Sequence, residues 1–328
     1  MIATPLEKQI PTIADVEAAR RRITPHLHPT PLYPSAALTE LVGTEIFVKH
    51  ENHLPIGAFK VRGGVNLVSQ LSEDERRSGV VTASTGNHGQ SIAFAAAVFG
   101  VRAIICVPEQ ANPVKVESMR ALGAEVVFHG RDFDAAREYC EKQATEHGYR
   151  YFHSGDEPLH VAGVATYTLE ILEARPDVEA IVVPVGGGSG AAGACVVAKA
   201  VRPSIEVIGV QSDAAPAAYR SWQARSLVED TMGTFAEGLA TRSAFELPQR
   251  IMWELLDDFV LVSEDALKTA TRVMLEKTRN LVEPAGAAAL AAVLAAPERF
   301  AGRRVAVICS GGNISPAQLL ALWPREPA

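Results

Sequence analysis

Residues 179–193, Glu-Ala-Ile-Val-Val-Pro-Val-Gly-Gly-Gly-Ser-Gly-Ala-Ala-Gly, hold the motif that decides the fold. A valine-rich apolar run ends in a cluster of glycines, and small apolar residues follow. This order is typical of a buried strand, a tight loop and a helix. Glycines let the backbone wrap a phosphate group, and the amino end of the following helix attracts its negative charge. The segment therefore predicts an anion-binding strand, loop and helix.

The same segment also satisfies a dinucleotide-binding pattern. Gly188 to Gly193 read G-x-G-x-x-G, and Asp213 follows near the end of the next apolar run. A nicotinamide dinucleotide site has an acidic residue about 20 residues after its glycines, to bind the ribose. At this point both a small phosphate-bearing cofactor and a dinucleotide are open.

Further apolar runs rich in valine and isoleucine alternate with longer helical patterns along the chain. They are EIFVKH (45–50), GVVTAS (79–84), RAIICVP (102–108), AEVVF (124–128), IEVIGVQ (205–211), DDFVLVS (257–263) and RRVAVICS (303–310). Strands this apolar, separated by helices, indicate a parallel sheet covered on both faces. Helix-start signals lie at Asn112-Pro113, Ser263 and Glu283-Pro284, and Gly100 is an expected helix end. The fold class is α/β.

Length and charge narrow the classes of function. The 328 residues suffice for one large or two intertwined domains. The formal charge is −7 and the basic residues form no long run, so neither nucleic acid nor an anionic membrane is an expected partner. Because the chain has neither a membrane-length apolar stretch nor a secretory signal, we expect a cytoplasmic protein with a small-molecule substrate.

The cysteines and the paired histidines do not indicate metal binding. No CxxC spacing connects the four cysteines, which we expect to be buried as small apolar residues; they are Cys106, Cys140, Cys195 and Cys309. His26 and His28 form an isolated pair, and no further histidine, cysteine or acidic cluster completes a zinc set. No metal site is predicted.

Residues 49–64, KHENHLPIGAFKVRGG, are unusually polar for their place between a strand and a helix. Lys60 follows Gly-Ala-Phe at an expected helix start. Backbone dipoles and apolar neighbours at such a position lower the pKa of a lysine and favour a nucleophilic amine. For this segment alone, an ordinary exposed lysine on a helix is the alternative.

Two other polar segments follow predicted strands. Residues 83–90, ASTGNHGQ, open a helix, where backbone N–H groups with hydroxyl and amide side chains form an anion site suited to a carboxylate. The alternative is a helix N-cap made by serine and threonine. Residues 309–313, CSGGN, close the last strand, where a hydroxyl can face a ligand at the carboxyl edge of the sheet. A tight turn is the alternative there.

Taken together and in this order, the four motifs resemble the threonine dehydratase and serine racemase family of pyridoxal-phosphate enzymes, which has the tryptophan-synthase-β-like fold. The resemblance runs from about Thr30 to Asn313. It implies two α/β domains: a large one, residues 1–49 and 155–328, binds the cofactor phosphate, and a small one, residues 50–154, carries the carboxylate-binding loop. It also implies a homodimer or a higher homo-oligomer.

The resemblance assigns the cofactor, pyridoxal 5'-phosphate, to particular residues. Lys60 would carry it as a Schiff base and, once released, would act as the base at the substrate Cα. Phe59 would flank the ring, Asn87 would hydrogen-bond the phenolic oxygen O3', and Ser310 would face the pyridine nitrogen. The phosphate would be held by the backbone of Gly186, Gly187, Gly188, Ser189 and Gly190.

The resemblance also implies the reaction. The substrate carboxylate would be held by Ser84, Thr85, Asn87 and His88. Because the neutral hydroxyl of Ser310 does not force protonation of the pyridine nitrogen, prompt β-elimination is favoured. We expect dehydration and deamination of a β-hydroxy amino acid, first of all L-threonine or L-serine, to a 2-oxo acid and ammonia. The Thr85 hydroxyl and the cofactor phosphate are both candidates for protonating the leaving hydroxide.

Several positions depart from the family pattern. Ala58 replaces a common serine, Ser189 and Gly190 replace a glycine and a larger apolar residue, and Gly163-Val164-Ala165-Thr166 replaces Gly-Gln-Gly-Thr. Gln211 stands where a metal-binding carboxylate is common, which again argues against a divalent metal. Thr85 leaves the choice between dehydratase and racemase open.

Other functions therefore stay open beside threonine or serine dehydration. On the same cofactor they are serine racemisation and dehydration of a bulkier substrate such as phenylserine, hydroxyaspartate or an ectoine-derived compound. From other classes they are a nicotinamide-dependent dehydrogenase and a non-catalytic amino-acid sensor.

Overall fold

The computed structural model describes residues 9–131 and 133–323, which divide into two compact units. Unit 1 comprises residues 9–28 and 54–166, and unit 2 comprises residues 29–53 and 167–323. Each unit consists of a sheet with helices packed against it. The predicted α/β class is therefore confirmed.

Unit 1 is built on a four-stranded parallel sheet in the order β5-β4-β3-β6. The strands are β3 (Val80–Ala83), β4 (Ala103–Val107), β5 (Glu125–Phe128) and β6 (Arg150–Tyr151). The helices are α1 (Ile13–Ile23), α3 (Lys60–Val68), α4 (Glu73–Ser78), α5 (Asn87–Phe99), α6 (Pro113–Ala121) and α7 (Phe133–His147). From β3 the chain continues to β4 and β5 on one side, whereas β6 returns to the other side. Open α/β sheets bind ligands at such a reversal.

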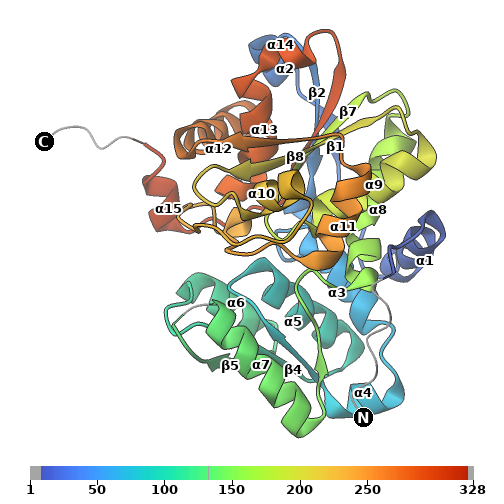
Figure 1. Ribbon diagram of the computed structural model, residues 1–328, viewed down its shortest axis with the longest axis vertical. Coiled ribbons are helices and arrows are strands. Elements are labelled where there is room, and N and C mark those ends of the chain that lie inside the picture. Colours follow the sequence, from blue (N-terminus) through green and yellow to red (C-terminus); the bar gives the residue numbers. More distant parts are fainter. Residues whose placement is uncertain (1–8, 132, 324–328) are drawn as a thin grey trace, which may run out of the picture. The chain divides into compact units, whose positions relative to one another are not determined.

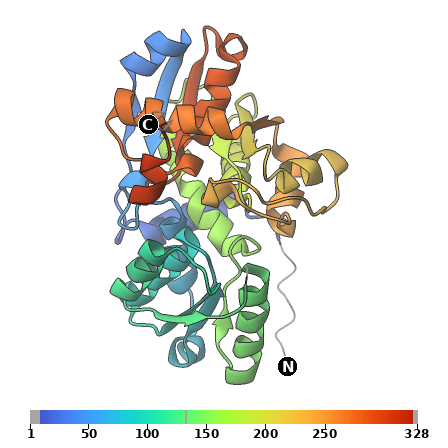
Figure 2. The same cartoon turned by 90° about the vertical axis from the view of Figure 1, so that its left-hand side faces the viewer.

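Both faces of the unit 1 sheet are covered, which explains its apolar strands. Ile104 and Cys106 of β4 pack in one cluster with Cys140 of α7. The residue between them, Ile105, faces α5, where a methyl group on Gly89 would lie 3.0 Å from its Cγ2. Figure 2 shows α7 on one side of these strands and α5 and α6 on the other. Alternating side chains therefore serve two apolar layers.

Unit 2 is built on a six-stranded sheet in the order β1-β2-β10-β7-β8-β9. The strands are β1 (Leu32–Pro34), β2 (Glu45–His50), β7 (Ala180–Pro184), β8 (Glu206–Ser212), β9 (Asp258–Val262) and β10 (Arg304–Cys309). All pairs are parallel except β1 with β2. The sequence did not predict β1, whose proline is tolerated because it lies at the edge of the sheet. Here the connections reverse between β7 and β10.

Helices cover the unit 2 sheet on both faces, with α12 and α13 on one side and α9 and α11 on the other (Figure 1). Alanines make up much of α13 and let it approach the strands closely, so it is buried nearly all round. The helices are α2 (Ala36–Val42), α9 (Ser189–Val201), α10 (Ala217–Ala224), α11 (Glu246–Leu255), α12 (Glu264–Thr278), α13 (Pro284–Ala295), α14 (Pro297–Phe300) and α15 (Pro316–Leu320), with short 3₁₀ turns η1 (Glu51–His53) and η2 (Glu237–Leu239).

The local predictions are largely confirmed. Every predicted apolar run forms a strand, and β6 is a further strand that the sequence did not predict. Asn112 and Ser263 cap α6 and α12 through their side chains, and Gly100 ends α5 in the left-handed conformation. The four cysteines are buried and unpaired. None of the helices in residues 9–131 and 133–323 combines the length and apolarity needed to cross a membrane.

The compact units do not coincide with the predicted domain boundaries, which had grouped 1–49 with 155–328. Residues 9–28 and 155–166 belong instead to unit 1, and residues 50–53 belong to unit 2. The reason is packing on α3: Arg22 of α1 donates to Asn66 of α3 at 3.4 Å, and Asn66 donates to the carbonyl of Leu159 at 2.7 Å. Leu159 lies in α8 (Pro158–Ala174), a helix that contributes residues to both units. The functions assigned to the two domains stay predictions.

Candidate active site

The first predicted loop joins β3 to α5 in unit 1. The Ser84 hydroxyl oxygen accepts hydrogen bonds from the backbone N–H groups of Gly86 at 3.0 Å and Gly89 at 2.8 Å. Ser84 is buried, whereas Thr85 is exposed and Asn87 is half-buried. Ser84 therefore shapes the loop in the manner of a cap, and the side chains of Thr85 and Asn87 lie on the more accessible part of the loop.

Lys60 is the first residue of α3, as predicted. Its Nζ donates to the carbonyl oxygen of Ser154 at 2.9 Å and lies 3.3 Å from Nε2 of His160. The backbone carbonyl of Lys60 accepts from the Ser91 hydroxyl of α5 at 2.7 Å. The amine therefore lies beside residues that follow β6, the strand next to β3 at the reversal of the sheet.

The pKa of the Lys60 amine is lowered, as the sequence predicts. Burial lowers the pKa of Lys60 to about 7, because an ammonium loses its hydration there. The ring of Phe59 lies 5.6 Å from Nζ and adds apolar surface. Near neutral pH a large share of the molecules therefore carry an uncharged, nucleophilic amine.

Imidazole side chains surround this amine in unit 1. The rings of His88 and His160 are both buried and meet edge to face, with their centroids 5.4 Å apart. Burial lowers the pKa of both far below the usual range, with Lys60 adding to the effect. His88 is among the residues predicted from the sequence, whereas His160 is not. No pattern marks His160 in the sequence, because it stands singly between apolar neighbours, Leu159 and Val161, three residues before the family departure at Gly163.

The glycine loop connects β7 to α9 in unit 2. A methyl group on Gly186 would lie 2.2 Å from the carbonyl oxygen of Gly238, and one on Gly187 would lie 2.2 Å from the ring of Phe245. Gly188 has a φ of +88°, which side chains disfavour. Only glycine fits these positions, so the loop presents backbone N–H groups at the start of α9. Such groups form a ready phosphate site.

Ser310 follows β10, the strand next to β7. It is buried, and its hydroxyl lies 3.5 Å from the carbonyl oxygen of Ala285, the outer limit of a hydrogen bond. The next residue, Gly311, accepts a hydrogen bond from the N–H of Glu283 at 3.1 Å. Ser310 and the glycine loop therefore follow neighbouring strands at the carboxyl edge of one sheet, where its connections reverse.

Each unit, taken by itself, offers groups that fit a part of pyridoxal 5'-phosphate. Unit 1 offers a lysine amine of lowered pKa for the aldehyde, and unit 2 offers a glycine cradle at a helix start for the phosphate. The neutral hydroxyl of Ser310 suits an unprotonated pyridine nitrogen. Within the described ranges, no cluster of three or more His, Cys, Asp or Glu side chains could hold a metal ion. Gln211 uses its amide oxygen to accept from the N–H of Tyr219 at 3.0 Å.

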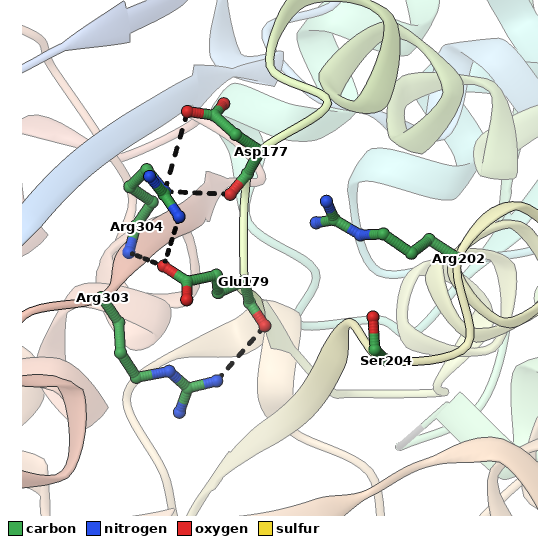
Figure 3. A pocket seen from close by; sticks show the side chains of 6 residues that line it. All are labelled: Asp177, Glu179, Arg202, Ser204, Arg303 and Arg304. Atoms are coloured by element: carbon green, nitrogen blue, oxygen red, sulfur yellow. Dashed lines mark hydrogen bonds and ion pairs between the residues drawn. The ribbon is translucent and has the colours of Figure 1, made fainter.

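A separate hollow of about 460 Å³ lies at the opposite, amino edge of the unit 2 sheet (Figure 3). Two of its arginines form ion pairs: Arg304 with Glu179 at 3.1 Å, and Arg303 with the neighbouring Glu206 at 2.6 Å. None of the predicted site residues lines it. The lining residues are Asp177, Glu179, Arg202, Ser204, Arg303 and Arg304.

Comparison with known proteins decides the cofactor. The model of the family described as pyridoxal-phosphate dependent enzyme matches residues 23–311. The chain belongs to this family. Its cofactor is pyridoxal phosphate, which resolves the alternative that the G-x-G-x-x-G pattern left open in favour of the smaller, phosphate-bearing cofactor.

Relatives of this pyridoxal-phosphate enzyme include lyases and a racemase. It is 39% identical to the L-threonine ammonia-lyase of Thermotoga maritima, over 92% of this chain and 76% of the relative. It is 34% identical to the L-threo-3-hydroxyaspartate ammonia-lyase of Saccharomyces cerevisiae, over 93% and 94% of the two chains. The crystal structure of serine racemase from Dictyostelium discoideum superposes with a TM-score of 0.87 at 35% identity, covering 93% of this chain and 99% of the other. The predicted tryptophan-synthase-β-like fold is confirmed.

Proposed function

We propose that this enzyme dehydrates and deaminates a small β-hydroxy amino acid, with L-threonine and L-serine as the first candidates. The observation that carries the proposal is the amine of Lys60, whose pKa burial lowers to about 7. An amine of this kind both reacts with a carbonyl group and accepts a proton near neutral pH. The identity to threonine and hydroxyaspartate ammonia-lyases supports the reaction class.

Each site residue has a proposed role. Lys60 binds the cofactor and, once free, takes the proton from the substrate Cα. Phe59 flanks the cofactor ring, Asn87 binds its phenolic oxygen, and Ser310 binds its pyridine nitrogen. The carboxylate is held by Thr85, Asn87, His88 and the loop that Ser84 shapes. The phosphate is held by the backbone of Gly186, Gly187, Gly188, Ser189 and Gly190.

The bound cofactor supplies the electron withdrawal that makes the Cα proton acidic. Ser310 limits this withdrawal, because a neutral hydroxyl does not hold a proton on the pyridine nitrogen as a carboxylate would. Ser310 would thereby favour prompt loss of the β-hydroxyl group once the Cα proton is removed. The exposed hydroxyl of Thr85 is the proposed donor of a proton to that leaving group.

Two neighbouring reactions are the second candidates, and the relatives favour them. The identity of 34% to the yeast hydroxyaspartate ammonia-lyase supports a substrate with a second carboxylate. The similarity to the Dictyostelium serine racemase supports inversion at Cα. Both reactions would use the same lysine and would diverge only after the Cα proton has been removed.

The test is an assay of the full-length protein loaded with pyridoxal 5'-phosphate. We expect 2-oxo acid and ammonia from L-threonine or L-serine, with little from the D-enantiomers. Release from L-threo-3-hydroxyaspartate alone would move the substrate class to the second candidate, and appearance of D-serine without 2-oxo acid would establish racemisation. Bound cofactor without any of these products would overturn the proposal and favour an amino-acid sensor.

The homodimeric assembly and the cytoplasmic location belong to the proposal as well. The chain has a mass of 35.0 kDa. Light scattering coupled to size-exclusion chromatography is expected to give twice this mass for a homodimer, and the single-chain mass would contradict it.

A further inference from the structure

His160 lies in the first turn of α8, and its side chain is fully buried. Its Nε2 is 3.3 Å from Nζ of Lys60. None of the four sequence motifs contains it. Its position next to the reactive amine is therefore a feature that only the folded structure of unit 1 reveals.

Close packing of α8 on α3 holds the ring in this position. A methyl group on Gly63 of α3 would lie 2.0 Å from Nδ1 of His160, so only a glycine leaves room for the imidazole. One turn later in α8, a methyl group on Gly163 would lie 2.8 Å from the Cα of Gly63. Two glycines thus bring the helices together around the ring and pack it closely beside the lysine.

Burial and the neighbouring basic groups keep the imidazole of His160 neutral. Burial lowers the pKa of His160 well below its usual range, and Lys60 of α3, His88 of α5 and His153 ahead of α8 lower it further. The titratable groups that face the ring are thus bases. At neutral pH the imidazole is uncharged, while Lys60, with its pKa of about 7, exchanges between amine and ammonium.

A neutral imidazole can hydrogen-bond to the lysine in both of these states. Its ring nitrogen accepts from an ammonium or amine N–H, and in the other tautomer it donates to the amine lone pair. A carboxylate at the same place would stabilise the ammonium and raise its pKa, which would weaken the amine as a nucleophile. Imidazole therefore fixes the position of the amine and leaves its reactivity intact.

We propose that His160 is a positioning residue that holds Nζ of Lys60 between its two tasks, cofactor binding and proton removal at Cα. The proposal rests on the proposed function of Lys60. Packing alone does not explain the histidine: within the described residues its Nδ1 has no hydrogen-bond partner. A buried unpaired polar atom costs about 1–3 kcal/mol, so an apolar side chain would pack there at lower cost.

The first experiment tests the contact without using turnover. In the cofactor-free full-length protein, the pH profile for acylation of Lys60 is measured by mass spectrometry of its peptide. The wild-type midpoint is expected at about 7. His160→Glu should raise the midpoint by about 1–3 pH units, because it places a carboxylate beside the amine, whereas the neutral His160→Gln should leave it nearly unchanged. An unmoved midpoint in His160→Glu would mean that residue 160 does not face the amine.

The second experiment tests the positioning role in the loaded enzyme. His160→Leu should lower kcat about 100-fold with little change in KM or in cofactor content, since misplacing a catalytic group by about 1 Å has an effect of this size. His160→Gln, which keeps a hydrogen-bonding group, should recover most of the loss. If His160→Leu does not fold, His160→Asn, which is too short to reach Nζ, takes its place with the same expectation.

Thr168→Val is the matched control. Thr168 is also a buried residue of α8, and its hydroxyl has no partner within the described residues. This variant should keep the wild-type kcat and the wild-type acylation midpoint. Wild-type kcat in His160→Leu would overturn the positioning role. If the loaded wild type turns over none of the candidate substrates, the proposed function fails, and the acylation midpoints alone then decide whether His160 acts on Lys60.

Discussion

The two units present their polar groups in the same topological way but with different chemistry. In unit 1 the sheet connections reverse between β3 and β6, and in unit 2 they reverse between β7 and β10. At each reversal, loops rich in polar or small residues follow the strands. Unit 1 offers a side chain that changes protonation near neutral pH, Lys60, beside the neutral imidazole of His160. Unit 2 offers backbone N–H groups and one neutral hydroxyl, that of Ser310.

The comparison shows how one architecture supports two kinds of recognition. A group that must gain and lose a proton depends on burial to set its pKa, as at Lys60. A group that holds a constant anion needs only fixed geometry, as at Gly186, where a methyl group would lie 2.2 Å from the Gly238 carbonyl. Substitutions at Lys60 in unit 1 should therefore change reactivity and pH dependence, and substitutions in the glycine loop of unit 2 should change cofactor affinity.

The largest effect is expected from Lys60→Ala. Loss of the amine removes the group proposed to bind the cofactor and to take the Cα proton, so kcat should fall by about 10³–10⁴-fold or more. The visible absorbance of the lysine-bound cofactor should vanish as well. Absorbance spectra and ammonia release measure the two effects. Lys142→Ala, at an exposed lysine of α7, is the control and should retain both. If Lys60→Ala retained turnover, the reactive amine would not be that of Lys60.

The next effect is expected from Gly186→Ala in unit 2. The added methyl group would collide with the backbone carbonyl of Gly238. Because the backbone moves only at a cost in free energy, the loop should shift and the fold should be destabilised by about 1–3 kcal/mol. Cofactor affinity, measured by titration of the cofactor-free protein, should fall together with the melting temperature. Gly209→Ala in β8, whose methyl group would lie 3.2 Å from the ring of Phe259 in β9, should lower only the melting temperature. Equal affinities in the two variants would contradict the glycine cradle.

A smaller effect is expected from Ser310→Ala. Removing one neutral hydrogen bond costs about 0.5–1.5 kcal/mol, so kcat should fall by about 2–10-fold. Ser310→Asp should instead shift the outcome, because a carboxylate retains a proton on the pyridine nitrogen and lengthens the life of the carbanion. The ratio of Cα hydrogen exchange with solvent to 2-oxo acid formation should rise in Ser310→Asp. An unchanged ratio would show that residue 310 does not control the electron withdrawal.

A separate effect, on stability and not on turnover, is a pH dependence that arises in unit 1. The folded pKa of Lys60, about 7, lies below its unfolded value, so the unfolded chain binds more protons between these two pKa values. Stability of the cofactor-free protein should therefore rise with pH across this window, relative to Lys60→Met. Melting temperatures of both proteins at about pH 7 and about pH 10 test this. A constant difference between them would show that burial does not lower the pKa of the lysine.

Much of this architecture can be predicted from local sequence. Valine-rich runs form strands because both faces of each sheet are buried, and Asn112 and Ser263 start helices because their side chains accept from backbone N–H groups. The sequence did not predict the short strands β1 and β6, because a run of two or three residues is too short to show a periodic pattern. The sequence also did not predict that α1 belongs to unit 1, because this depends on contacts with α3, which is distant from α1 in the sequence.

Some residues of the candidate site could likewise be predicted from the sequence, and others could not. The glycine loop, Lys60 and Ser310 are legible in the sequence because each combines an unusual residue with a strand end or a helix start. The Ser84 hydroxyl accepts hydrogen bonds from Gly86 and Gly89 in the structure, which the sequence did not predict, and its contact with the substrate stays a prediction. His160 lies 100 positions from Lys60 in the chain and carries no motif.

The resemblance of the chain's four ordered motifs indicated the cofactor family, and the reactive role of Lys60 stays a prediction. By itself, the sequence determined the α/β class and the described strands other than β1 and β6. These features depend on residue type and on spacing within one strand, loop or helix. Tertiary structure decided which helices join which unit, how strongly the lysine amine is desolvated, and that an imidazole stands beside it. Burial and close approach arise from contacts between distant segments, so no local pattern contains them.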